Sequence, residues 1–273
     1  MAPLSAPPER EFPWWLLIAA AFGAWFLART LASEIHAEIL GTVIRGLWVT
    51  LFVTFIAFAA ACALGLGLAL ALLSRSALLR QGARLYVEIM RGVPILVLLL
   101  YVAFVLAPAL VAAWNWAGAH LGLEPLRTRD FPLLWRAILA LTLGYAAFVA
   151  EVFRAGILAV DPGQVEAAKA LGLRPRQRFR HVVWPQAIRA ILPPLGNDFV
   201  AMVKDSSLVS ALGVLDVTQL GKLAAAANFR YFETYNIVAV IYLTLTITLS
   251  LMLRRLEARL RRAGAPSPRG REP

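Results

Sequence analysis

The chain has 273 residues, of which 60% are hydrophobic and 16% are charged, and its formal net charge is +11. Soluble domains carry about 25% charged residues, so this composition argues against a soluble globular protein and indicates lipid as the main solvent. The arginines cluster between apolar runs, which is typical of the cytoplasmic side of membrane proteins and argues against a nucleic-acid partner. A single cysteine, Cys62, excludes an intrachain disulfide.

Residues 1–38 are predicted to contain a polar, proline-rich segment and an additional N-terminal membrane helix. The apolar stretch 14–28 has tryptophans near its ends (Trp14, Trp15 and Trp25), as helices anchored at a membrane interface do. A cleaved signal peptide is the rival interpretation. Because the positively charged segment that begins a signal peptide is missing, we favour a retained helix.

The next membrane crossings follow from the lengths of the apolar runs, since about 20 apolar residues cross a bilayer. Such runs occupy 41–73, 95–111, 133–160, 190–215 and 236–253. The first of them exceeds one crossing, so part of it is expected to lie along or outside the membrane face. Gly65 and Gly67 within it predict close helix packing. The chain is therefore predicted to be an all-α integral membrane protein.

The connections between the runs carry more specific expectations. Residues 114–130 are expected to form a loop of mixed charge. Pro94 predicts a helix break, with Glu88 and Arg91 forming a charge pair at the cytoplasmic boundary just before it. The Pro193–Pro194 pair is expected to open the fifth span. Residues 39–256 are taken as the transmembrane domain and 257–273 as a basic, disordered cytoplasmic tail.

The distribution of Lys and Arg predicts the orientation of the chain in the membrane. Segments 75–91, 161–189 and 254–273 carry 4, 6 and 7 of these residues. The alternating segments 29–40, 111–136 and 216–233 carry only 1, 3 and 2. The positive-inside rule therefore places the first set in the cytoplasm and predicts six crossings with both ends inside. A cleaved first segment would leave five crossings.

The polar segment 161–185 separates two of the predicted spans and is patterned as a helix, a corner and a second helix. Asp161 and Pro162 suit a helix start, and Gln164 can reach back to the first turn. Gly172 supplies the left-handed residue that ends a helix. Pro175 can start a short second helix, whereas Trp184 is expected to leave the helical conformation because it precedes Pro185. The predicted exposed face of small side chains consists of Ala167, Ala168 and Ala170.

Charged residues inside predicted spans cost roughly 2.5–3.5 kcal/mol each and need a partner or a function. Glu151 and Arg154 lie three residues apart and can pair on one helix face. In the fifth span, heptad spacing makes two polar stripes facing protein or a watery path: Asn197 with Lys204, and Asp198 with Asp205. These groups either neutralise one another near the cytoplasmic ends or line a route for a polar solute, and spacing alone does not separate the two readings.

Signatures of enzymatic function are missing from the sequence. The three histidines, His36, His120 and His181, are expected in different loops and have no spacing typical of a metal site or a catalytic triad. The phosphate-binding pattern GxxxxGK[ST] is absent, since Gly221 and Lys222 are followed by Leu223. Any use of ATP is therefore expected to come from another chain.

The pattern of segment 161–185 resembles the cytoplasmic EAA loop of ABC importer permeases. Glu166-Ala167-Ala168 is followed after three residues by Gly172 and after nine more by Val182-Val183-Trp184-Pro185. The family pattern has Ile where this chain has Val182, and Leu where it has Trp184. The stretches YVEIMRGVPILV, AAFVAEVFRAGI, GQVEAAKALGL and PQAIRAILPPLGNDFVAMVKDSSLVS are similar to the polar amino-acid branch, the histidine/glutamine/glutamate type. The resemblance covers roughly residues 39–256.

The resemblance implies a five-span permease core in the bacterial inner membrane, here with an extra N-terminal span. Such permeases pair with an identical copy or a paralogue, bind two ATPase subunits that hold ATP and Mg, and receive solute from an extracytoplasmic binding protein. The chain itself would hold no cofactor. Residues implied in ATPase coupling are Gly163, Gln164, Glu166, Ala167, Ala168, Ala170, Leu171, Gly172 and Pro185.

For the substrate path, the resemblance points to the fourth and fifth spans, and thus to Glu151, Arg154, Asn197, Asp198, Lys204 and Asp205. A carboxylate there could meet the amino group of a basic or zwitterionic amino acid, while Arg154 could take a substrate carboxylate. Two alternatives to an ABC permease remain: a self-sufficient, ion-coupled carrier or channel, and a membrane scaffold that transports nothing.

Overall fold

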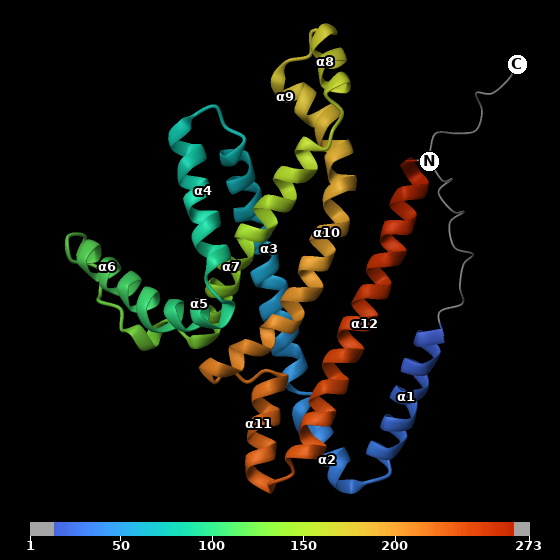
Figure 1. The fold of residues 1–273 in the computed structure, drawn as a ribbon. Helices are drawn as coiled ribbons and strands as arrows, with labels where there is room; N and C mark the ends of the chain where they lie inside the picture. Colours follow the sequence, from blue (N-terminus) through green and yellow to red (C-terminus); the bar gives the residue numbers. More distant parts are fainter. Residues whose placement is uncertain (1–13, 265–273) are drawn as a thin grey trace, which may run out of the picture.

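The computed structural model describes residues 14–264, and every regular element in that range is helical (Figure 1). The all-α prediction is thus confirmed. The elements are α1 (Trp14–Leu31), α2 (Glu34–Val43), α3 (Gly46–Leu72), α4 (Ala77–Gly92), α5 (Ile95–Tyr101), a π-helix (Val102–Leu106), α6 (Ala107–Ala119), a 3₁₀ turn (Thr128–Asp130), α7 (Leu133–Leu158), α8 (Pro162–Ala170), α9 (Pro175–Arg178), a second π-helix (Phe179–Val183), α10 (Trp184–Asp205), a 3₁₀ helix (Ser206–Leu212), α11 (Val217–Asn228) and α12 (Tyr231–Gly264).

Four helical segments in the described range are long and apolar enough to cross a membrane. They are Glu34–Leu72, Ile95–Ala119, Leu133–Leu158 and Tyr231–Ala258. The set does not include α1, which has 18 residues, or α10, which has 22 residues and several charged side chains. The six predicted crossings are therefore supported at four positions, and those of α1 and α10 stay predictions.

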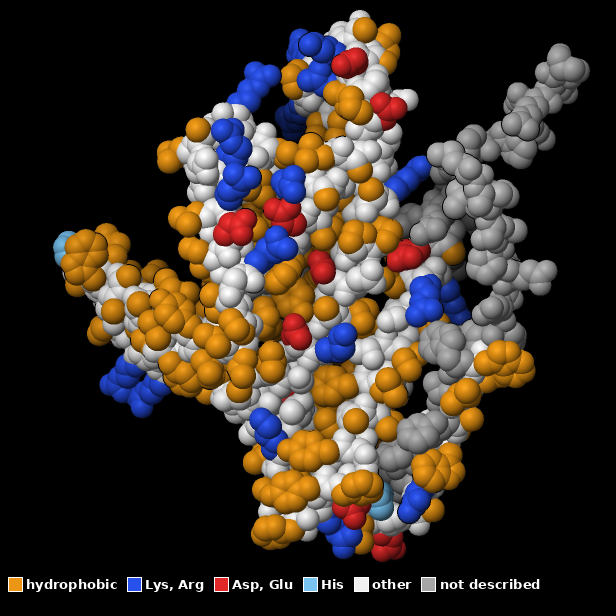
Figure 2. Space-filling model, in the orientation of Figure 1, with side chains coloured by type: hydrophobic (Ala, Val, Ile, Leu, Met, Phe, Trp, Pro, Cys, Tyr) orange, Lys and Arg blue, Asp and Glu red, His pale blue; other side chains and the backbone are white. Residues whose placement is uncertain are grey.

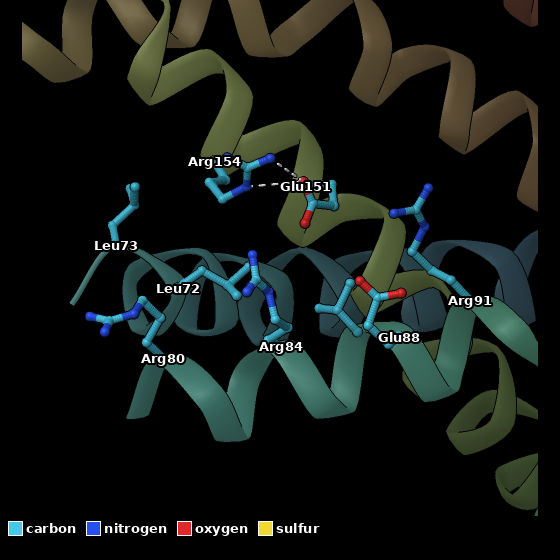
Figure 3. Close-up of a pocket in the computed structure, with 9 residues that line it drawn as sticks. Leu72, Leu73, Arg80, Arg84, Glu88, Arg91, Glu151 and Arg154 are labelled. Atoms are coloured by element: carbon cyan, nitrogen blue, oxygen red, sulfur yellow. Dashed lines mark hydrogen bonds and ion pairs between the residues drawn. The ribbon is translucent and has the colours of Figure 1, made fainter. Parts of the chain in front are cut away.

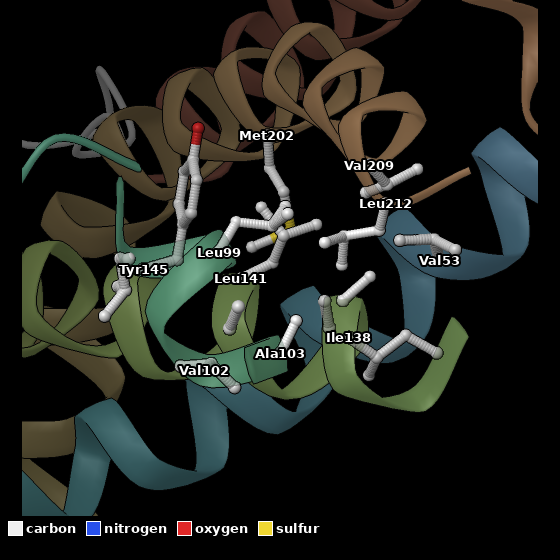
Figure 4. Close-up of a cluster of buried hydrophobic side chains, with 14 of the residues drawn as sticks. Val53, Leu99, Val102, Ala103, Ile138, Leu141, Tyr145, Met202, Val209 and Leu212 are labelled. Atoms are coloured by element: carbon white, nitrogen blue, oxygen red, sulfur yellow. The ribbon is translucent and has the colours of Figure 1, made fainter. Parts of the chain in front are cut away.

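Helix α7 forms the centre of the bundle, with α3, α10 and α4 packed around it (Figure 1). A Cβ atom on Gly65 of α3 would lie 2.7 Å from Cγ1 of Val149 on α7, so the predicted close packing at Gly65 is confirmed. The same prediction is wrong for Gly67, where a Cβ would meet nothing within 4 Å. The largest buried cluster joins Leu99, Leu141 and Met202 from three different elements (Figure 4). Packing thus holds α7 on several sides.

The break at Pro94 is confirmed, because α4 ends at Gly92, Pro94 has an extended ψ of 137°, and α5 begins at Ile95. The predicted loop 114–130 is partly wrong, since α6 continues to Ala119. Helices α5 and α6 form an arm that projects from the bundle (Figure 1). Buried Arg136 of α7 holds the base of this arm by donating hydrogen bonds to three backbone carbonyls, those of Ala103, Thr128 and Phe131.

Helix α2 meets α3 at Ile44–Arg45, so the long apolar run is divided into two helices. Gly46 is required at this corner, because a Cβ there would lie 2.4 Å from the backbone carbon of Asp216. Asp216 is fully buried and caps α11 by accepting the N–H of Gln219 at 2.8 Å and the hydroxyl of Tyr242 at 3.0 Å. Burial raises the pKa of Asp216, and these hydrogen bonds lower it in part. This network ties α3, α11 and α12 together.

Helix α10 differs from the prediction at its start and at its prolines. Trp184 has helical dihedral angles (φ −60°, ψ −45°), so the expected bend before Pro185 is wrong. The preceding π-helix already sets helical backbone angles, and Pro185 falls in the first turn of α10, where a missing N–H costs little. Pro193 and Pro194 lie inside α10 and do not open it.

The arginine-rich segments lie at one end of the molecule. Figure 1 places the α3–α4 turn, α8 with α9, and the C-terminal end of α12 together, opposite α2 and α11. This arrangement agrees with the grouping of the segments by their Lys and Arg content. Helix α12 continues to Gly264, so the tail predicted to be disordered from residue 257 is helical up to that residue. Residues 1–13 and 265–273 lie outside the described range.

Candidate functional site

The segment that resembles the EAA loop folds as a helix, a corner and a second helix. Asp161 caps α8 by accepting the N–H of Gly163 at 2.7 Å, and Pro162 occupies the first turn. Gly172 follows the helix with φ +76°, the left-handed conformation that favours glycine. Helix α9 begins at Pro175. The predicted helix start at Asp161, the corner at Gly172 and the second helix from Pro175 are therefore confirmed, whereas the bend predicted at Trp184 is not.

The outer face of α8 is exposed and nearly free of bulk, apart from one leucine. Gly163, Ala167, Ala170 and Leu171 follow helical spacing and are all exposed, with Leu171 82% exposed. Glu166 and Gln164 are exposed beside them. Ala168 is only 4% exposed, so its place on the predicted outer face is wrong. Pro185 is exposed but belongs to α10 rather than to this face.

The inner face of α8 packs on α9 and on the π-helix that precedes α10. Val165 lies against a buried cluster that contains Phe153 of α7, Val183 of the π-helix and, at its edge, Phe179 and Trp184. Ala168 turns inward because it lies three residues after Val165 on the same face. Helix α8 is thus attached to the membrane helices by apolar packing as well as by the chain.

A cavity of about 380 Å³ lies between α4 and α7 (Figure 3). Within it the predicted pair of Glu151 and Arg154 is confirmed, because Oε2 of Glu151 accepts Nε at 3.0 Å and Nη2 at 2.6 Å. Both side chains are partly exposed to the cavity, 30% for Glu151 and 37% for Arg154. The hydrogen bonds found in the described range leave the other glutamate oxygen, Oε1, without a donor. The lining residues are Leu72, Leu73, Arg80, Arg84, Val87, Glu88, Arg91, Glu151 and Arg154.

Helix α4 contributes charged side chains to this cavity that were not expected there from the sequence. Glu88 and Arg91 form no ion pair with each other among the described residues, so the predicted boundary pair is wrong. Arg91 instead lies over the ring of Phe148 at 5.7 Å, and Glu88 lines the cavity with Arg80 and Arg84. Arg80, Arg84, Glu88 and Arg91 are spaced by four, four and three residues, so they lie on one face of α4. This spacing is the sequence signal that could have identified them as a group. Figure 2 shows acidic and basic side chains gathered over α4 and α7.

The polar residues of α10 lie elsewhere and separate into two environments. Tyr145 of α7 donates its hydroxyl to Oδ2 of Asp205 at 2.7 Å. Oδ2 of Asp198 is buried and has no hydrogen-bond partner among the residues that the structure describes. Asn197 and Lys204 are exposed on the adjacent face of the helix. None of these four lines the 380 Å³ cavity, so the structure does not bring them together with Glu151 and Arg154.

Sequence comparison relates the chain to transport proteins. A family model described as the binding-protein-dependent transport system inner membrane component matches residues 63–262. The probable amino-acid permease protein YxeN of Bacillus subtilis (strain 168) is 37% identical over 223 residues, which is 82% of this chain and 93% of that protein. The glutamine transport system permease protein GlnP of Escherichia coli (strain K12) is 36% identical over 179 residues, 66% of this chain and 74% of that protein.

Structural comparison gives the same relationship. The crystal structure of an amino acid ABC transporter with histidines matches with a TM-score of 0.68 at 37% identity, over 82% of this chain and 96% of that chain. An inward-facing structure of the MetNI methionine ABC transporter matches with a TM-score of 0.64 over 84% of this chain and 99% of that chain, and at 22% identity it supports the fold alone. The family match, the identities and the shared fold establish that this integral membrane chain belongs to the binding-protein-dependent transport system inner membrane components.

Proposed function

We propose that the chain is the membrane-spanning permease subunit of an ATP-driven importer of polar amino acids. As a membrane component of this family it is not itself an enzyme. The observation that carries the proposal is the exposed outer face of α8, which projects at the arginine-rich end of the bundle and carries an uncovered Leu171. Small residues let a partner approach the helix closely, and burial of the apolar Leu171 side chain on docking would contribute to the binding free energy.

In this proposal separate ATPase subunits bind the outer face of α8, and they hold the ATP and Mg. Closure of the ATPase subunits displaces α8, and the bundle alternates between cavities open to either side of the membrane. The arginine-rich end, including the C-terminal end of α12, lies in the cytoplasm. A second permease, identical or paralogous, completes the path, and an extracytoplasmic binding protein delivers the solute.

The charges of the cavity between α4 and α7 favour an amino acid with a neutral or acidic side chain. Four arginines face two glutamates there, so an additional cation is disfavoured and a carboxylate is attracted. Oε1 of Glu151 offers an acceptor for the α-ammonium group. A zwitterionic substrate therefore fits this cavity better than a basic one. Asn197, Asp198, Lys204 and Asp205 of α10 do not line this cavity, and their place on the substrate path stays a prediction.

The test is reconstitution in proteoliposomes of the permease with its ATPase and binding protein. We expect ATP-dependent uptake of glutamine or glutamate that is absent when the permease is reconstituted alone. Uptake by the permease alone, driven by an ion gradient, would instead identify a self-sufficient carrier. A full complex whose ATPase does not respond to loaded binding protein would identify a scaffold and contradict the proposal.

A further inference from the structure

Three aromatic rings connect the α8–α9 segment to the central helix. The ring of Trp184, at the start of α10, lies 5.9 Å from that of Phe179 in the π-helix. The same ring lies 6.4 Å from the ring of Phe153 on α7, with the two planes inclined by only 22°. Phe153 is 5% exposed, so this end of the stack is fixed within the bundle. The rings of Phe179, Trp184 and Phe153 together form an aromatic stack.

The other connections of α8 to the membrane helices are deformable. The chain from α7 to α8 passes through the short non-helical link at residues 159–161. The chain from α9 to α10 passes through the π-helix, a form of helix found mostly as local bulges and often at functional sites. Force applied to the outer face of α8 would bend these links first, unless a packed contact braces them. The aromatic stack lies where such a brace is needed, since Val165 of α8 joins the same cluster.

Displacement of Phe153 must displace the charged pair of the cavity. Phe153 shares one turn of α7 with Glu151 and Arg154 but points to the opposite side from Glu151. A helical turn is rigid, so the buried ring and the cavity charges move together. At the following turn, a Cβ on Gly156 would lie 2.2 Å from Cγ1 of Ile191, which shows how closely α7 and α10 approach there.

We propose that the aromatic stack is the mechanical link through which α8 controls the position of Glu151 and Arg154. Trp184 and Phe153 are positioning residues in this link and do not touch the solute. The EAA pattern that the loop resembles has Leu at the position of Trp184, and a leucine side chain could not form such a ring stack. The inference rests on the proposed function, because it assumes that ATPase subunits move α8.

The experiment measures ATPase activity of the assembled complex with and without loaded binding protein. For Trp184→Ala we expect the ratio of stimulated to basal activity to fall at least about fivefold, the lower range of coupling between distant sites. Trp184→Phe keeps a ring in the stack and should restore most of the ratio. Leu99→Ala is the matched control, because Leu99 is fully buried in the separate core cluster of Figure 4 and its truncation should leave the ratio unchanged.

A double-mutant cycle then distinguishes a mechanical link through Trp184 and Phe153 from a general loss of packing. If Trp184 and Phe153 act in one path, the double variant Trp184→Ala/Phe153→Ala should be no worse than either single variant. Additive losses, an unchanged ratio in Trp184→Ala, or an equal loss in Leu99→Ala would each overturn the inference. Should Trp184→Ala fail to assemble, Phe153→Leu keeps apolar volume without a ring, and a wild-type ratio in that variant would overturn the inference as well. A wild-type complex without stimulation would contradict the proposed function instead.

Discussion

Gly172→Val tests whether the corner after α8 must hold its left-handed conformation. A Cβ at Gly172 would meet nothing within 4 Å, so valine causes no clash and its cost is confined to the backbone. Placing a β-branched residue at φ +76° costs about 1–2 kcal/mol, a factor of about 5–30 in the population of the native corner. The bundle should stay folded, while α8 samples orientations that do not fit the ATPase. We therefore expect a folded complex whose ATP-dependent uptake falls by a similar factor.

Two matched substitutions serve as controls for Gly172→Val. Gly172→Asn should retain more uptake than Gly172→Val, because asparagine tolerates the left-handed region better. Gly41→Val places the same side chain on α2, at a site with open space and without a positive φ, and should leave uptake unchanged. Uptake and thermal stability are measured in parallel for all variants. Wild-type uptake by Gly172→Val, or equal losses for Val and Asn, would refute the argument from backbone conformation.

Four further substitutions test the outer face of α8, the contact between α7 and α10, the charged cavity and the cap at Asp216. Leu171→Ala should weaken ATPase binding about tenfold, because docking would bury less apolar area, and should not lower the melting temperature, because the side chain is exposed; equal affinity in a pull-down titration would contradict a docking role. Gly156→Ala should destabilise the protein by about 1–3 kcal/mol through overpacking against α10, which a thermal shift assay can measure and an unchanged melting temperature would exclude. Glu151→Gln should raise the KM for uptake, since it weakens the pair with Arg154 and the acceptor for the substrate ammonium; an unchanged KM would remove Glu151 from the substrate path. Asp216→Ala should lower the free energy of unfolding by about 1–3 kcal/mol, because a buried helix cap is lost; stability equal to wild type would show that the cap is dispensable.

Most of the features that the sequence predicted correctly depend on neighbouring residues. The cap at Asp161, the corner at Gly172 and the break at Pro94 each follow from the conformational preferences of one or two residues. The pair of Glu151 and Arg154 follows from the spacing of one helix turn. Such signals survive folding because no distant contact competes with them.

The errors concern properties that the tertiary contacts decide. Ala168 looks equivalent to Ala167 in sequence, but only packing on the π-helix determines which of the two is buried. Gly65 and Gly67 share one helix, but only Gly65 faces α7. The cavity charges of α4 were not assigned because the partner helix α7 lies more than 40 residues further along the chain. The helical state of Trp184 shows that a preceding π-helix can outweigh the local preference against helix before proline.

Arg136 has a consequence for the order in which the chain is assembled during synthesis. The α5–α6 arm leaves the ribosome before α7. The carbonyl of Ala103 accepts a hydrogen bond from Arg136 at 2.9 Å, and this donor is added to the chain 33 residues later. Ala103 lies in a segment long and apolar enough to cross a membrane, where an unpaired carbonyl has a large cost. The nascent arm must therefore remain hydrated, or sheltered by the insertion machinery, until the first turn of α7 emerges and fastens it.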